Sequence, residues 1–131
     1  MTPRILVADD SEVIRELMRT IFSSFGYSVT FAEDGHAAWE VLLTCQPDLV
    51  VLDIEMPRLD GCEVCRRIKS HPETRNIPVI LLSGRHDTAD LARRFGADAF
   101  LNKPFSINDL RFRVDSLLSQ CMSPQMAQAA H

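Results

Sequence analysis

The segment Asp48-Leu-Val-Val-Leu-Asp53, followed by Ile54-Glu-Met-Pro-Arg-Leu-Asp-Gly61, decides the fold class of this 131-residue chain. Four consecutive apolar residues at 49–52 are typical of a central strand in a parallel sheet, which is covered on both faces. Asp53 ends that strand, and a carboxylate at the end of a buried strand is costly unless another group pairs with it or coordinates it. The segment therefore predicts a buried parallel strand that ends in a functional acid.

Outward from this segment, strands and helices alternate five times along the chain. Apolar periodicity together with helix start and stop signals, such as Gly26, Gly96 and Ser106, defines the elements. The expected strands are 5–8, 27–32, 49–52, 77–82 and 98–101, and the expected helices are 11–25, 35–45, 61–70, 88–95 and one from 106 onward. Such alternation predicts an α/β domain with a parallel sheet, right-handed crossovers and helices on both faces.

The bulk properties indicate one globular domain at residues 1–121, followed by a loosely ordered tail or linker start at 122–131. A formal net charge of -4 does not favour nonspecific nucleic-acid binding. No apolar segment approaches the ~20 residues that span a bilayer, and the N-terminus lacks a signal-peptide pattern. We therefore expect a cytoplasmic protein that binds neither nucleic acid nor membrane.

The four cysteines are expected to be reduced in such a protein. Cys62-Glu-Val-Cys65 has the spacing of a redox or metal motif, but it lies where a helix begins after Asp60-Gly61 rather than directly after a strand. The pair is interpreted as two small helix residues, with metal or redox chemistry as the alternative.

Polar groups stand at the ends of three other expected strands: the adjacent acids Asp9 and Asp10, Ser83, and Lys103. Because the carboxyl ends of parallel strands lie on one edge of a sheet, where ligands bind in open α/β folds, these groups should converge with Asp53. Three acids would repel one another without a cation, and Mg²⁺ prefers one or two carboxylates together with water and a phosphate oxygen. The set predicts a small site for a divalent cation and a phosphoryl group.

Each of these residues also has a simpler interpretation. Asp9 and Asp10 could only complement a helix dipole, Asp53 and Ser83 could be turn residues, and Lys103 could face solvent. In the functional interpretation, Asp53 is a carboxylate nucleophile and Lys103 directs an ammonium group at a phosphate. The joint arrangement is far more specific than any one member.

The set resembles the receiver domain of two-component response regulators over residues ~4 to ~120. The matching motifs are Ile5-Leu-Val-Ala-Asp-Asp10, Leu52-Asp53 with Met56-Pro57 and Asp60-Gly61, Ile80-Leu-Leu-Ser83, Gly96-Ala97-Asp98 and Lys103-Pro-Phe105. The resemblance implies a flavodoxin-like, doubly wound, five-stranded parallel sheet of order 2-1-3-4-5 with five helices.

By resemblance, Asp53 would accept a phosphoryl group from a phosphohistidine on a sensor histidine kinase or histidine phosphotransfer protein. Asp10, Asp53 and the backbone carbonyl of Glu55 would ligate Mg²⁺, and Asp9 would act mostly through a coordinated water. Lys103 and the Ser83 hydroxyl would hold phosphoryl oxygens, and the Lys103-Pro104 bond would be cis.

The resemblance also implies a switch, in which Ser83 moves toward the phosphoryl group and Phe100 turns inward. This would remodel the face made by the fourth helix, fifth strand and fifth helix. The chain has Ser83 where Thr is frequent, Gly84 where Ala is frequent, and Phe100 without the hydroxyl of a Tyr. Separately, Glu55 and Arg85 lie two residues beyond Asp53 and Ser83, and we hypothesise that they pair across the site entrance and limit the access of water.

Three functions remain as hypotheses. The first is a phosphorylation-switched signalling domain that catalyses only its own phosphorylation and dephosphorylation and is not otherwise an enzyme. The second is a receiver-like interaction module that works without phosphate, and the third is a phosphatase with an aspartate nucleophile. The domain could act alone on a downstream effector protein, or be fused to an output domain. A homodimer formed through the switching face is a further alternative.

Overall fold

The computed structural model describes the backbone of residues 2–129 and the side chains of residues 2–120. Five strands and five helices alternate along the chain. They are β1 (Arg4–Ala8), α1 (Glu12–Ser24), β2 (Ser28–Ala32), α2 (Gly35–Cys45), β3 (Leu49–Asp53), α3 (Gly61–Ser70), β4 (Val79–Ser83), α4 (Thr88–Phe95), β5 (Ala99–Asn102) and α5 (Ile107–Ala129).

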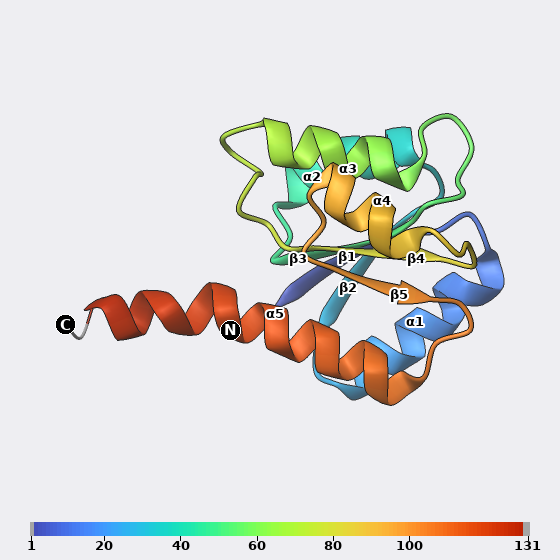
Figure 1. Ribbon diagram of the computed structural model, residues 1–131. Helices are drawn as coiled ribbons and strands as arrows, with labels where there is room; N and C mark the ends of the chain where they lie inside the picture. The colour runs from blue at the N-terminus through green and yellow to red at the C-terminus, as the bar shows by residue number, and fades with distance from the viewer. Residues whose placement is uncertain (1, 130–131) are drawn as a thin grey trace.

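All strand pairs are parallel, and the sheet has the order β2-β1-β3-β4-β5. Helices α2, α3 and α4 cover one face of the sheet, and α1 and α5 cover the other (Figure 1). The flavodoxin-like α/β architecture expected from the sequence is confirmed. The strand order reverses direction between β1 and β3, which places the switch point of the sheet at the carboxyl ends of these two strands.

Local sequence signals account for the helix ends. The side chains of Asp34, Asp60 and Ser106 each accept a hydrogen bond of 2.8–2.9 Å from the amide three residues onward, so each caps a helix N-terminus. Gly96 ends α4 with a φ of 82°, a left-handed conformation that glycine adopts without steric cost. The boundaries of α2, α3 and α4 agree with those expected from the sequence.

Strands β3 and β4 are buried along their whole length, as expected for central parallel strands. Successive side chains of β3 point to opposite faces of the sheet. Thus Leu52 belongs to the core beneath α2, α3 and α4, and Val51 belongs to the core beneath α1 and α5. Apolar cores on both faces of the sheet therefore hold β3 in place, and with it Asp53.

The strand bounds differ from the sequence expectations by one or two residues. The fourth strand begins at Val79 because Ile77 donates its amide to the Thr74 carbonyl and so belongs to the preceding turn. On α1, Val13 shares the helical spacing of the core residues but is 76% exposed. The helical backbone of α5 extends through residue 129, and its last turns project beyond the sheet (Figure 1).

The boundary between residues 1–121 and 122–131 as domain and tail stays a prediction. No helix in the described part of the chain combines the length and the apolar composition that a membrane span requires.

Candidate functional site

Three carboxylates gather at the carboxyl edge of the sheet. Asp9 follows β1 and Asp53 ends β3, and these strands are direct neighbours. Carboxylate oxygens of Asp9, Asp10 and Asp53 all lie within 4.8 Å of one another. Asp9 is fully buried, Asp53 is 3% exposed, and Asp10 faces solvent. The arrangement thus has two buried acids at its base and one at its mouth.

Lys103 reaches this cluster from the segment that follows β5. Its Nζ lies 3.2 Å from Asp9 Oδ2 and 3.4 Å from Asp53 Oδ2. The Lys103 amide donates to the Ser83 carbonyl at 2.8 Å, which ties the base of its side chain to the end of β4. The bond between Lys103 and Pro104 is cis. One ammonium group therefore bridges two buried carboxylates, and the cluster keeps an excess of negative charge.

Burial and neighbouring charges together shift the pKa values of two members of the cluster. Burial, followed by the Asp9 carboxylate, raises the pKa of Asp53 from 3.8 to about 6, although Lys103 opposes the shift. Burial lowers the pKa of Lys103, but the attraction of Asp53 and Asp9 outweighs it, so this pKa lies above its ordinary value. Asp53 is thus a carboxylate that would gain from additional positive charge.

The start of α1 fixes the Asp9 carboxylate in place. Asp9 Oδ1 accepts the Ser11 amide at 2.9 Å, and the Arg15 guanidinium donates to the backbone carbonyl of Asp9 at 2.8 Å. Sequence reasoning missed Arg15, which lies on α1, six residues after Asp9. Its separation from Asp9 gives no signal without the helix geometry.

Gly61 sets the turn that carries Asp53. A Cβ at this position would lie 2.3 Å from the backbone oxygen of Asp53, so any larger residue would displace the end of β3. The Gly61 amide also donates to the Ile54 carbonyl at 3.0 Å. The Asp60-Gly61 motif therefore has a structural role in holding the loop after Asp53 closed.

Ser83 ends β4 and is fully buried. Its Oγ donates to Glu55 Oε1 at 2.7 Å and accepts from the Arg85 amide at 3.0 Å. The hydroxyl is thus bound to the side chain that follows Asp53 by two residues, rather than to a member of the carboxylate cluster.

The hypothesised ion pair between Glu55 and Arg85 is not what the structure shows, and we correct it. Arg85 forms a two-point contact with Asp87, with Nε–Oδ1 at 2.8 Å and Nη2–Oδ2 at 3.0 Å. Asp87 lies on the same loop, and the forked guanidinium matches both of its carboxylate oxygens. Glu55 instead engages Ser83. Both residues flank the site, but they do not close it together.

Phe100 lies on β5, opposite Leu81 of β4, and is partly buried against the core beneath α2, α3 and α4. Its role in a switch stays a prediction. Cys62 and Cys65 are buried free thiols, and burial raises their pKa values to about 11 and about 12, which disfavours the reactive thiolate. Cys45 is also free, and the side chain of Cys121 lies outside the described residues.

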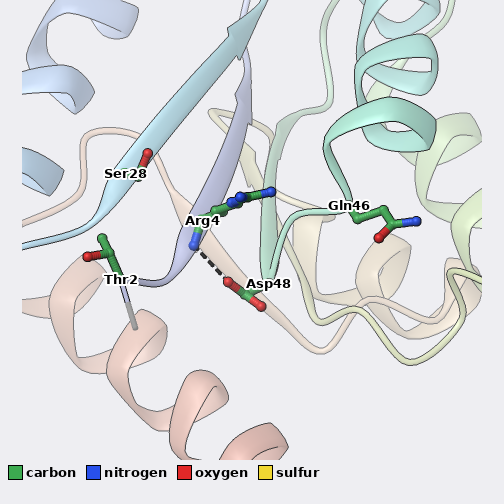
Figure 2. Close-up of a pocket in the computed structure, with 5 residues that line it drawn as sticks. All are labelled: Thr2, Arg4, Ser28, Gln46 and Asp48. Carbon is green, nitrogen blue, oxygen red and sulfur yellow. Dashed lines mark hydrogen bonds between the residues drawn. The ribbon is translucent and has the colours of Figure 1, made fainter.

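Two surface hollows differ in their relation to the site. One, of about 500 Å³, is lined by polar side chains where β1 and β2 begin, so it lies at the sheet edge opposite to the carboxylates (Figure 2). The other, of about 370 Å³, directly adjoins the site and is largely apolar. It is lined by Ile14, Leu17, Lys103, Pro104 and Phe105.

Comparisons with known proteins agree with this geometry. The profile of the response regulator receiver domain matches residues 5–115. The chain is 42% identical over 120 residues to the response regulator MprA of Mycolicibacterium vanbaalenii, which covers 90% of this chain and 51% of that protein. It is 38% identical over 131 residues to the MprA of Mycobacterium bovis, covering 98% of this chain and 56% of that protein. The chain thus spans about half the length of these relatives.

Solved structures give the same result. The receiver domain of a signal transduction histidine kinase from Syntrophus aciditrophicus superimposes with a TM-score of 0.84 at 36% identity, covering 91% of this chain and 92% of that one. The receiver domain of a Francisella response regulator has a TM-score of 0.84 at 34% identity, covering 91% and 98%. Because the receiver-domain profile covers most of the chain and the fold matches these receiver domains, the chain belongs to the family of response regulator receiver domains.

Proposed function

We propose that the domain is switched by transfer of a phosphoryl group to Asp53 in a Mg²⁺-dependent reaction. The observation that carries this proposal is the position of Asp53 beside Asp9 and Asp10, with the Lys103 ammonium 3.4 Å from its Oδ2. Phosphoryl transfer needs little covalent chemistry from a protein beyond the nucleophile, because positioning and charge neutralisation supply most of the catalysis. The described residues provide the positioning, and Lys103 together with a bound cation would supply the neutralising charge.

In the proposed reaction, an Asp53 carboxylate oxygen forms a bond to phosphorus, and the bond from phosphorus to the donor imidazole nitrogen breaks. The donor ring carries a proton on its other nitrogen, so it keeps the electron pair of the broken bond and leaves as neutral imidazole, and an acyl phosphate remains on Asp53. Lys103, now shared between Asp9 and Asp53, would turn its ammonium to the incoming phosphoryl oxygens. The reaction modifies the domain itself, so we do not propose a separate substrate or enzymatic turnover.

The donor set fits Mg²⁺. All three acids offer oxygen ligands, which this hard cation prefers, and their oxygens are close enough to share one ion. Three acids face one ammonium group in this cluster, so a divalent cation would offset their excess negative charge. Asp10, Asp53 and the carbonyl of Glu55 would hold the ion and Asp9 would support it through water, while the bound ion would neutralise phosphoryl charge.

The output of the switch would arise at α4, β5 and α5. Ser83 ends β4 beside the site, and Phe100 lies on the neighbouring strand β5. A phosphoryl group adds about two negative charges and strong hydrogen-bond acceptors, which gives Ser83 a new partner. Movement of Ser83 would open room for Phe100 to turn inward, and the altered face would bind an effector protein, a fused output domain or a second copy of the domain.

The proposed phosphoryl donor is a sensor histidine kinase or a histidine phosphotransfer protein. The apolar hollow beside Lys103 supports a protein donor, because its wall includes Leu17, which is 43% exposed. Apolar surface next to a reactive site suits a protein partner better than a small phosphate ester. We expect Leu17→Asp to slow transfer from a phosphohistidine protein without changing the rate with acetyl phosphate.

The experiment that tests the proposal is intact mass after incubation with acetyl phosphate, with and without Mg²⁺. We expect one phosphoryl adduct that requires Mg²⁺ and is absent from Asp53→Asn. An adduct on Asp53→Asn would place the acceptor elsewhere. Absence of any adduct, with a phosphohistidine protein as well as with acetyl phosphate, would favour the phosphate-independent interaction module.

A further inference from the structure

The Ser83 hydroxyl has a single proton, and in this structure it donates that proton in a hydrogen bond to Glu55. Ser83 Oγ lies 2.7 Å from Glu55 Oε1, a carboxylate oxygen that can only accept. The Arg85 amide, 3.0 Å away, donates to the same hydroxyl and therefore cannot take its proton. The hydroxyl cannot donate to a phosphoryl oxygen while it donates to Glu55.

We propose that Glu55 is a positioning residue that holds Ser83 in the unphosphorylated arrangement and releases it when Asp53 is phosphorylated. This inference rests on the proposed function and adds a competing acceptor to it. Glu55 acts through Ser83 rather than on the reacting atoms. The state of the switch depends on whether the Ser83 hydroxyl donates its hydrogen bond to the Glu55 carboxylate or to the phosphoryl group.

The charges around Asp53 favour release after phosphorylation. The Glu55 carboxylate already repels the Asp53 carboxylate, and it adds to the causes that raise the Asp53 pKa. A phosphoryl group would increase the negative charge facing Glu55 and at the same time offer Ser83 a strong acceptor. Glu55 is exposed, so water can solvate its carboxylate once the hydrogen bond from Ser83 is broken.

The loop after Ser83 has open space around Gly84, whereas contacts hold it in place from Arg85 onward. A Cβ built at Gly84 would meet no atom within 4 Å, so nothing encloses this residue. From Arg85 onward the loop is held by the Arg85–Asp87 contact and by Thr88 Oγ1, which donates to the Arg85 carbonyl at 2.9 Å. The movable part of the switch is therefore limited to residues 83–84.

A double-mutant cycle tests the competition. The rate of phosphorylation by acetyl phosphate with Mg²⁺ is measured for Glu55→Ala and Glu55→Gln, each with Ser83 and with Ser83→Ala. Both Glu55 variants lose the charge, but Gln keeps an oxygen that accepts from the hydroxyl. The ratio of the Ala rate to the Gln rate therefore isolates the hydrogen bond from the charge.

We expect Glu55→Ala to react about three- to tenfold faster than Glu55→Gln when Ser83 is present, the range that one hydrogen bond of ordinary net strength supplies. In the Ser83→Ala background this ratio should fall to about 1. Equal ratios in the two backgrounds would overturn the proposal, because the effect of Glu55 would then not pass through the hydroxyl.

A second measurement needs no phosphorylation. Scalar couplings in NMR spectra report the Ser83 χ1 rotamer of the unmodified protein. We expect one rotamer in the wild type and in Glu55→Gln, and averaging between rotamers in Glu55→Ala. A single fixed rotamer in Glu55→Ala would refute the role of Glu55. If no variant accepts a phosphoryl group, the proposed function fails, and the rotamer result alone still decides whether Glu55 holds Ser83.

Discussion

Replacement of Asp53 by Asn should stabilise the fold when no divalent cation is present. The pKa of Asp53 rises from 3.8 to about 6 on folding, chiefly because the carboxylate is buried and secondly because Asp9 repels it. At about 1.36 kcal/mol per pH unit, the ionised carboxylate costs about 3 kcal/mol of folding free energy at pH 7. This is an upper limit for Asp53→Asn, because Lys103 loses one of its two carboxylate partners.

The sign of the pH dependence follows from the raised pKa. Between about pH 4 and pH 6 the folded wild type binds more protons than the unfolded chain, so its free energy of unfolding falls as the pH rises through this range. Asp53→Asn lacks this group. Its advantage over the wild type should therefore grow from about 1 kcal/mol at pH 4.5 to about 3 kcal/mol at pH 7.

Urea unfolding in the presence of EDTA, followed by far-UV circular dichroism, measures this difference at both pH values. Added Mg²⁺ should narrow the gap at pH 7, because a cation that binds only the folded wild type at 100 times its Kd stabilises it by about 2.7 kcal/mol. An advantage of Asp53→Asn that stays the same from pH 4.5 to pH 7 would refute the assignment of the cost to the buried charge.

Two further predictions concern the scaffold, and both are measured by urea unfolding. Gly35→Ala should cost roughly 2–4 kcal/mol or prevent folding, because the new Cβ would lie 1.8 Å from the backbone oxygen of Leu59, whereas Gly84→Ala, which meets no atom within 4 Å, is the matched control. Lys69→Met should cost about 1–3 kcal/mol, because the Lys69 ammonium donates to two carbonyl oxygens and to the Asp98 carboxylate. Arg93 of α4 forms only an exposed ion pair, so a loss no larger than that of Arg93→Met would contradict this.

The sequence was sufficient for the parts of the structure that topology controls. A buried apolar run ending in Asp53 requires a central parallel strand, and parallel strands send their carboxyl ends to one edge. This rule alone brings Asp9, Asp10 and Lys103 to Asp53, although as many as 94 residues separate Asp9 from Lys103 in the chain.

Side-chain pairing within exposed loops could not be predicted in the same way. Glu55 and Arg85 flank the site as their sequence positions indicate, but each has a nearer partner in Ser83 and Asp87. Exposed ion pairs differ by only about 0–1 kcal/mol, so the choice among them depends on rotamers and loop geometry that no sequence pattern specifies. The close approach of Gly35 to Leu59 could not be predicted from the sequence either, because it is a contact between the backbones of two segments that are distant in the chain.

Chemical trapping locates the phosphoryl group and so tests whether Asp53 is the acceptor. The protein is phosphorylated with a phosphohistidine donor and Mg²⁺ and then reduced with borohydride, which converts an aspartyl phosphate to homoserine. Peptide mass spectrometry then locates the product. We expect homoserine at position 53 and at no other aspartate. Homoserine at position 9 or 10, or phosphate on a hydroxyl side chain, would refute the assignment of Asp53 as the acceptor.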